Sequence, residues 1–189
     1  SSFELEKLLS ESIEKQLISD VPIGAFLSGG IDSSLVVSLM QKISGNTNTF
    51  TIGFDFSEFD ESKTASKIAK YLGTNHTSYI CTQEDVINKI PMIPNAFTEP
   101  FADSSQIPTM LVSELASKKV KVVLSGDGGD ELFGGYNRYL YANKYWKYFS
   151  MMPNSLRNKI ISLVKINKSK KLLYYFIKNL FKQKNINYE

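Results

Sequence analysis

The sequence predicts an α/β protein: a parallel twisted sheet with helices on both faces, followed by a helical C-terminal part. Two observations lead to this fold class. Short apolar runs suited to buried strands alternate with segments whose apolar residues recur at helical spacing. After residue 138 only helical patterns follow, and they are rich in Tyr and Lys. Strands that alternate with helices form βαβ units, which build parallel sheets covered on both sides.

The first part of the chain supplies three predicted strands and the helices between them. The run TFTIGF is β-branched and aromatic, which favours a strand. Gly45 and Gly73 each stand just after a helical pattern, where glycine commonly ends a helix. In chain order we expect a helix over 3–18, a strand over 22–27, a helix over 35–43, a strand over 49–54, a helix over 61–72 and a strand over 76–81.

The second part adds a fourth strand and the remaining helices. Pro91 ends a predicted helix over 84–90, because proline cannot continue the hydrogen-bond ladder. Residues 94–109 carry three prolines and are expected to form a loop before a helix at about 109–117. The run VKVVL at 120–124 is the fourth strand, and a second glycine-rich loop follows it.

Composition excludes several classes of protein. With 189 residues, 42% apolar and 22% charged, the chain suits one folded domain. No apolar run approaches the roughly 18 residues of a membrane-spanning helix, so we expect no membrane association. One cysteine, Cys81, and one histidine, His76, exclude a disulfide and a Cys/His zinc site, and both are interpreted as structural. No secretory signal is evident, so we expect a cytoplasmic protein. The first residue is Ser1 rather than Met, which suggests a fragment of a longer protein.

The charges divide unevenly along the chain. Residues 1–143 hold 11 Lys and Arg against 18 acids, whereas residues 144–189 hold 11 against the single Glu189. A basic tail could attract nucleic acid, anionic lipid or pyrophosphate, but solvated helix faces are the favoured explanation. We therefore predict no nucleic-acid partner. We expect residues 1–143 to form the core and 144–189 a basic helical extension of the same domain, cut short at its end.

The first glycine loop, LSGGIDSS at 27–34, lies between a predicted strand and a predicted helix. Backbone N–H groups converge at such a junction, and the helix dipole favours an anion there. No lysine follows the glycines, so it is not a Walker A loop, and G-x-G-x-x-G is absent too. The alternative is a Gly-Gly turn in which Ser or Asp caps the next helix.

The second glycine loop, SGDGGDE at 125–131, follows the VKVVL strand. Its acids Asp127, Asp130 and Glu131 would repel phosphate but suit Mg²⁺, which takes oxygen ligands and bridges to nucleotide phosphates. A solvated acidic turn is the alternative. Both loops begin where a strand ends, and open parallel sheets bind ligands outside the carboxyl ends of their strands. Together the loops predict a nucleotide–magnesium site.

These motifs resemble those of a known family. SGGIDSS at 28–34 is similar to the PP-loop of the N-type ATP pyrophosphatases. The set VPIGAFLSGGIDSSLV, FTIGF, LGTNH, EPFADSS and LSGDGGDELFGGYNRY, in this order, closely resembles the synthetase domain of glutamine-dependent asparagine synthetases. The resemblance runs from about residue 2 to about residue 145 and implies an adenine nucleotide alpha hydrolase-like fold.

The resemblance implies an ATP-dependent carbon–nitrogen ligase. Such enzymes adenylate the side-chain carboxylate of aspartate, release pyrophosphate, and let ammonia displace AMP to give asparagine. ATP and Mg²⁺ are the implied cofactors. The implied source of ammonia is glutamine, hydrolysed by an N-terminal glutaminase domain that we expect in the full-length protein. A homodimer is a possible assembly of the full-length protein.

The resemblance also assigns residues by motif position. A pyrophosphate cradle is implied for Ser28, Gly29, Gly30, Ser33 and Ser34. Nucleoside contacts are implied for Leu27 and Ile52, and a further part of the ATP site for Ser125 and Gly126. Asp32 and Asp130 match the Mg²⁺-binding acids, and Asp127 matches an acid near the reacting centre. A wall of the site is implied for Glu99, Asp103, Ser104 and Ser105.

Two segments of the family have no counterpart in these 189 residues: the glutaminase domain, and a later segment with a lysine that faces the phosphates. The sequence therefore does not decide whether this chain catalyses the ligase reaction without those segments. Related enzymes amidate sugar acids or close β-lactam rings, so another acid acceptor is an alternative. A non-catalytic nucleotide-binding scaffold is a second alternative, although the presence of both Asp32 and Asp130 argues against it.

Overall fold

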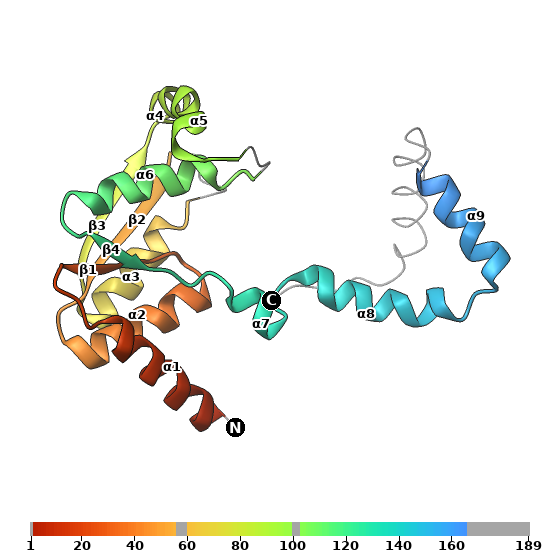
Figure 1. Cartoon of the computed structure of the whole chain (residues 1–189), viewed down its shortest axis with the longest axis horizontal. Coiled ribbons are helices and arrows are strands. Elements are labelled where there is room, and N and C mark those ends of the chain that lie inside the picture. The colour runs from red at the N-terminus through yellow and green to blue at the C-terminus, as the bar shows by residue number, and fades with distance from the viewer. Residues whose placement is uncertain (1, 56–59, 100–102, 166–189) are drawn as a thin grey trace. The chain divides into compact units, whose positions relative to one another are not determined.

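The computed structural model describes residues 2–55, 60–99 and 103–165, and its sheet consists of parallel strands (Figure 1). The strands are β1 (Ile23–Phe26), β2 (Asn48–Phe54), β3 (Asn75–Cys81) and β4 (Val122–Leu124). They lie in the order β3-β2-β1-β4, and Ala25 of β1 pairs with Thr49 on one side and Leu124 on the other. The predicted parallel α/β sheet is confirmed.

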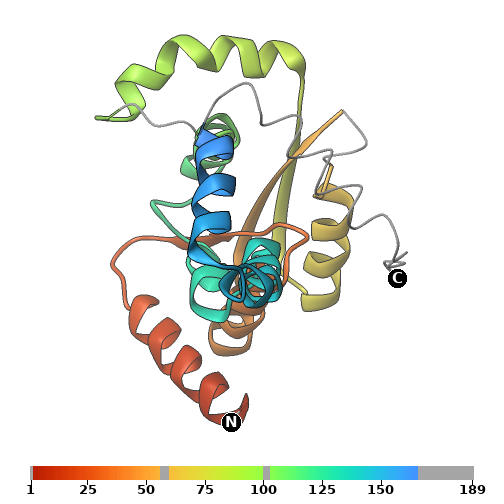
Figure 2. The same ribbon diagram turned by 90° about the vertical axis from the view of Figure 1, so that its right-hand side faces the viewer.

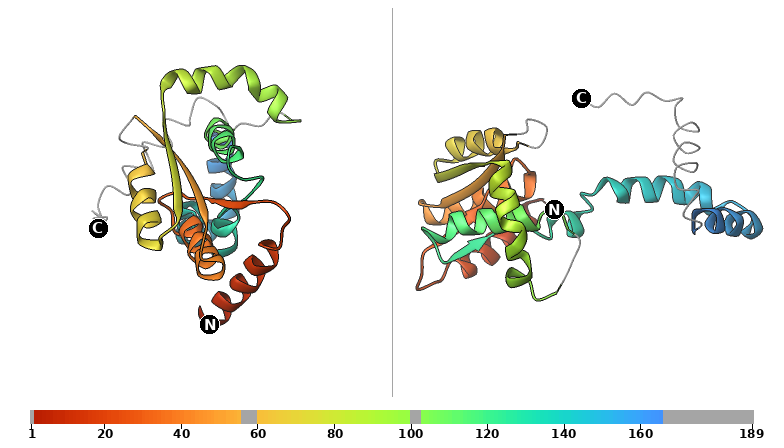
Figure 3. Two further views of the ribbon diagram at one scale, coloured as in Figure 1. Left: turned by 90° about the vertical axis from the view of Figure 1, so that its left-hand side faces the viewer. Right: turned by 90° about the horizontal axis from the view of Figure 1, so that it is seen from above.

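Helices cover both faces of this sheet. The helices before β4 are α1 (Ser2–Gln16), α2 (Ile31–Ser44), α3 (Ser62–Leu72), α4 (Gln83–Lys89), the short 3-10 helix η2 (Ile90–Met92), α5 (Ile93–Ala96) and α6 (Gln106–Ser117). In Figures 2 and 3, α3 and α6 lie on opposite sides of the strands. Helix α1 lies beside α2 (Figure 1). Its buried Ile13 belongs to the same apolar cluster as Val37 and Met40 of α2.

Two apolar cores result from this layering. The core under α2 and α3 contains Ala25 and Leu27 with Val37, Met40, Ala65 and Ala69. The core under α6 contains Phe50, Ala116 and Val120. Ala25 belongs to the first core, and the next residue, Phe26, packs against the second, because successive strand residues point to opposite faces. Burial on both faces explains why β1 shows no apolar–polar alternation.

The strand order changes direction between β1 and β4, because β2 and β3 lie on one side of β1 and β4 lies on the other. Such a place is a topological switch point. The chain proceeds from β1 outward to β2 and β3, with α2 and α3 on one face, and then returns through α6 on the other face to β4. The segments that follow β1 and β4 therefore leave two neighbouring parallel strands at the same end of the sheet. Ligands of open α/β sheets bind in the crevice that forms at such a point.

Prolines account for the largest differences from the predicted elements. Helix α6 begins at Gln106 rather than near 109, with Pro108 in its first turn, where the missing N–H has no helical partner to lose. For the same reason Pro91 and Pro94 lie in the first turns of η2 and α5. Helix α2 begins at Ile31 instead of 35, directly after the glycines. A short helix, α7 (Gly129–Phe133), forms where only a loop was expected.

The chain divides into two compact units, residues 1–133 and 134–189. The described part of the second unit contains α8 (Asn137–Ser150) and α9 (Asn154–Lys165), so its predicted helical character is confirmed there. The Arg157 guanidinium lies 5.5 Å from the centroid of the Phe149 ring and donates to the carbonyl of Ser150, which ties the two helices together. Residues 166–189, which carry most of the predicted basic tail, lie outside the described residues.

No helix within the described ranges combines the length and the apolar character needed to cross a lipid bilayer.

His76 lies at the amino end of β3, at the sheet edge opposite the two loops. Its Nδ1 is 3.0 Å from Thr49 Oγ1 of β2, and its Nε2 is 3.5 Å from Ser66 Oγ of α3. Burial lowers the pKa of His76, because the imidazolium would lose its hydration. These contacts join strand and helix, in accord with a structural role.

The first prediction concerns pH. Because the pKa of His76 is lowered from 6.5 in the fold, the unfolded chain takes up this proton at a higher pH than the folded chain. The free energy of unfolding should therefore fall as pH drops through 6.5, by at most about 1.4 kcal/mol per pH unit. Urea unfolding at about pH 7.5 and 5.5 measures this fall. His76→Gln should lack it, and an equal pH dependence in both proteins would contradict the assignment.

Cys81, at the end of β3, is fully buried, and burial raises the pKa of its thiol to about 11. The thiolate is the reactive form, so the folded protein should resist iodoacetamide at about pH 8. Mass spectrometry should show alkylation only after denaturation. Rapid modification of the folded protein would mean that β3 opens readily at this end.

Candidate functional site

The first glycine loop leads from β1 into the amino end of α2. Gly30 is the residue before the helix, with extended backbone angles (φ −79°, ψ 158°), and no side chain caps the helix. The capping alternative that Ser or Asp offered is therefore not what the loop adopts. An uncapped first turn leaves backbone N–H groups and the positive end of the helix dipole facing the crevice. This is the usual geometry of an anion site.

Serine hydroxyls brace the loop from within. The Ser28 N–H donates to Ser33 Oγ (3.1 Å), and the two hydroxyl oxygens lie 2.8 Å apart. The Gly30 N–H donates to Ser28 Oγ (3.0 Å), and Ser34 Oγ donates to the Gly30 carbonyl (2.6 Å). The predicted cradle thus consists of the turn Ser28–Gly30 and of Ser33 and Ser34 in the first turn of α2. Their hydroxyls can donate to a ligand after a simple rotation.

A residue absent from the predicted site contacts this loop. The Gly29 N–H donates to Glu61 Oε2 at 3.3 Å. Glu61 immediately precedes α3 and is 32 residues away in sequence, so only folding brings it here. An acid before a helix ordinarily indicates capping or a dipole interaction, and for that reason Glu61 carried no functional signal.

The second glycine loop lies directly against the first. A Cβ on Gly126 would fall 2.6 Å from the backbone nitrogen of Ser33, and a Cβ on Gly129 would fall 2.5 Å from Asp32 Cγ. At Gly126 only glycine permits this approach, whereas a side chain at 129 would displace the Asp32 carboxylate. The structure therefore brings the two loops together at the switch point and sets the Asp32 carboxylate beside the first residue of α7. Asp130 is the next residue of that helix.

The acids of the second loop differ in their surroundings. Asp127 Oδ2 accepts a hydrogen bond from Ser125 Oγ (2.9 Å), which fixes its carboxylate. In the described part of the chain, no three His, Cys, Asp or Glu side chains gather closely enough to enclose a metal. Asp32 and Asp130 offer hard oxygen donors without a closed cage. That donor set fits Mg²⁺, which commonly takes one or two carboxylates and completes its shell with water and phosphate.

Leu27 and Ile52 are the predicted nucleoside contacts. The Leu27 side chain is 2% exposed and belongs to the core under α2, while its N–H donates to the Phe50 carbonyl and its own carbonyl accepts from Thr51 Oγ1. Ile52 of β2 is half-buried and pairs with Tyr79 of β3. Leu27 therefore anchors the loop by its packing and presents no open surface.

The predicted wall of the site is only partly described, because residues 100–102 lie outside the described ranges. Asp103 Oδ1 accepts from the N–H and the hydroxyl of Ser105, and these bonds lower the pKa of Asp103. Glu99 is exposed. The described residues of this segment form the turn that leads into α6.

Comparison with known proteins agrees with the motifs. Residues 4–186 match the asparagine synthase family. The chain belongs to this family. The match continues well beyond residue 145, where the motif resemblance ends, so it includes most of the basic segment.

Two relatives illustrate the similarity. The chain is 37% identical over 163 residues to asparagine synthetase [glutamine-hydrolyzing] 1 of Bacillus subtilis, covering 86% of the chain and 26% of that protein. It is 42% identical over 156 residues to putative asparagine synthetase [glutamine-hydrolyzing] 2 of Methanocaldococcus jannaschii, covering 82% and 30% respectively. The chain thus spans between a quarter and a third of the length of these two asparagine synthase relatives.

Solved structures support the fold. The NH3-dependent NAD synthetase from Campylobacter jejuni aligns with a TM-score of 0.51 at 18% identity, covering 98% of this chain and 89% of that one. An NMN synthetase from Francisella tularensis gives 0.52 at 20% identity, covering 72% and 58%. At such identities the similarity concerns fold alone, and it confirms the adenine nucleotide alpha hydrolase-like architecture expected of the asparagine synthase family.

Contact between the loops yields the third prediction. Gly126→Ala should force the loops apart, because the new methyl meets backbone at Ser33 that cannot move aside. We expect ATP affinity, measured by calorimetry, to fall at least about tenfold, with about 1–3 kcal/mol lost from the free energy of unfolding.

Gly45→Ala is the matched control. Gly45 disfavours alanine for a different reason, its positive φ of 69°, and no atom lies within 4 Å of its would-be Cβ. The substitution should lower stability by about 1–2 kcal/mol and leave ATP affinity unchanged. Equal ATP affinities for Gly126→Ala and Gly45→Ala would show that close contact of the loops is not needed for binding.

Proposed function

We propose that this chain is the ATP-binding part of an amide ligase that converts aspartate to asparagine. One observation carries the proposal: at the switch point a donor-rich turn and an acidic turn are in van der Waals contact. The first suits a pyrophosphate group, and the second suits the cation that accompanies it. The names of the asparagine synthase relatives supply the reaction and the acid acceptor.

In this proposal the first loop binds the β- and γ-phosphates of ATP. The uncapped amino end of α2 and the hydroxyls of Ser28, Ser33 and Ser34 would donate to phosphate oxygens. The aspartate carboxylate attacks the α-phosphorus, the α–β phosphoanhydride bond breaks, and pyrophosphate leaves. Ammonia then attacks the activated carbonyl and AMP departs. Donors fixed in advance stabilise the charge that develops on the leaving group.

Asp32 and Asp130 would hold Mg²⁺, which when bound withdraws charge from the phosphates. Asp32 reaches this position because Gly129 leaves space for its carboxylate. We place Asp127 near the reacting centre, with its carboxylate oriented by Ser125. Ser125 and Gly126, from the second glycine loop, would line the ATP site on the side opposite the first loop.

The remaining partners follow from the same proposal. The names of the relatives specify glutamine hydrolysis, and this chain spans about a quarter of the Bacillus subtilis protein. We infer that ammonia reaches the site from a glutaminase domain of the full-length protein, in the cytoplasm.

Product analysis tests the proposal. The chain is incubated with Mg·ATP, ammonium chloride and L-aspartate, and AMP, pyrophosphate and asparagine are quantified with and without aspartate. Aspartate-dependent AMP together with asparagine supports the ligase. ADP and phosphate would contradict the assignment of the loops. Tight ATP binding without turnover would favour the nucleotide-binding scaffold.

The fourth prediction addresses the acids. Asp32→Ala and Asp130→Ala should each lower magnesium-dependent ATP turnover by at least about a hundredfold, because each removes charge that the cation needs. Asp20→Ala is the control, since Asp20 is exposed and precedes β1 at the opposite edge of the sheet. Normal turnover by either site variant would disprove the two-carboxylate arrangement.

A further inference from the structure

The first loop holds three consecutive backbone N–H groups, and each already has an acceptor within the chain. The Ser28 N–H donates to Ser33 Oγ, the Gly30 N–H to Ser28 Oγ, and the Gly29 N–H to Glu61 Oε2. An incoming phosphate must therefore replace acceptors that are present before it arrives.

The three acceptors are not equivalent. Ser28 and Ser33 carry hydroxyls, which can turn and donate to the same phosphate that takes their place. Glu61 carries a carboxylate, which accepts only and has the same sign of charge as the ligand. Of the three acceptors, Glu61 is thus the one that cannot keep its place beside pyrophosphate at the Gly29 N–H.

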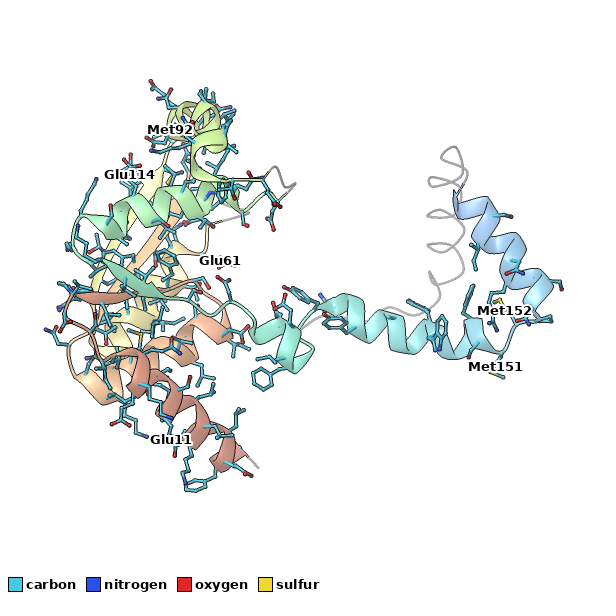
Figure 4. The ribbon with its side chains drawn as sticks, in the orientation of Figure 1. Glu11, Glu61, Met92, Glu114, Met151 and Met152 are labelled. Carbon is cyan, nitrogen blue, oxygen red and sulfur yellow. The ribbon has the colours of Figure 1, made fainter. Side chains whose placement is uncertain are left out.

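The fold fixes where Glu61 stands. Its carbonyl accepts from the Ala65 N–H (3.0 Å), which ties its backbone into the first turn of α3. A Cβ on Gly29 would lie 3.2 Å from Thr64 Cβ and 3.6 Å from Glu61 Cβ, so the loop rests on that turn. Figure 4 labels Glu61. This residue is exposed, so its side chain can swing away without disturbing α3.

Capping of α3 does not explain this glutamate. Glu61 is the residue before the helix, yet its side chain makes no cap hydrogen bond to α3. Asp60 accepts from the Ser62 N–H instead (3.0 Å). The Glu61 carboxylate is directed to the glycine loop, 32 residues earlier in the chain.

We propose that Glu61 is an internal competitor of the pyrophosphate group. It occupies the Gly29 N–H when the site is empty, must leave when the phosphates of ATP bind, and lowers the affinity of the loop for free pyrophosphate by returning. The proposal rests on the proposed function, because it requires the first loop to bind pyrophosphate. It assigns Glu61 a role in setting phosphate affinity and releasing product.

The test measures binding of inorganic pyrophosphate by calorimetry, with and without Mg²⁺, to the wild-type chain and to Glu61→Gln. Glutamine keeps the shape and an accepting oxygen but lacks the charge. We expect pyrophosphate to bind about three- to tenfold more tightly to the variant, the range for losing one exposed charge-assisted contact. Glu61→Ala should also gain affinity, whereas loss of a merely structural contact would weaken binding.

Glu84→Gln is the matched control, because it removes the same charge from an exposed position on α4. Its pyrophosphate affinity should equal that of the wild type. Affinity for adenosine, which has no phosphate, should be the same in all four proteins. An equal gain in Glu84→Gln would mean that net charge alone is responsible, and would overturn the proposal.

The remaining outcomes separate the two proposals. If wild type binds pyrophosphate and Glu61→Gln binds it no more tightly, Glu61 is not a competitor and the nucleotide site stands. If Glu61→Gln binds more weakly only with Mg²⁺ present, Glu61 is a cation ligand, which also overturns the competition. If none of the proteins binds pyrophosphate or ATP, the proposed function fails and the role of Glu61 fails with it.

Discussion

The close approach of the second loop to the first, with Gly126 against the backbone of Ser33 and Gly129 against the side chain of Asp32, is the constraint on which the site depends. Parallel pairing of β1 with β4 puts the ends of both strands at one end of the sheet, so the loops that follow them meet there. A side chain at 126 would clash with the backbone of Ser33, and one at 129 would clash with the Asp32 carboxylate. The crevice therefore depends on the sheet topology and on glycine at positions 126 and 129.

The sequence was informative wherever a pattern was local. β-Branched runs, glycines after helices and glycine loops after strands gave the strands, most helices and the paired loops, because each signal lies within about ten residues. Predictions failed where proline was treated only as a helix breaker: α6 starts at Gln106 because the first turn tolerates Pro108. Helix α7 was missed because it is only five residues long and glycines surround it, which favours a loop.

Glu61 shows what local patterns cannot supply. In the sequence it is an acid ahead of a helix, and its ordinary explanation is a cap. Its actual partner, Gly29, comes from another βα unit, and the pairing arises because α2 and α3 lie on the same face of the sheet. Leu27 supports the loop from the core through its side chain, and its predicted contact with a nucleoside stays a prediction.

A loop whose donors are already satisfied behaves differently from an open anion hole. Buried or half-buried N–H groups are unfavourable when unpaired, so internal acceptors keep the empty loop in one conformation. Binding then becomes an exchange of acceptors, and its net free energy is the difference between two sets of hydrogen bonds. Ser28 and Ser33 make that difference small, since their hydroxyls remain useful after the exchange. The proposed ligase would release pyrophosphate in every cycle, and a loop that re-forms its own bonds would stay hydrogen-bonded after the product leaves.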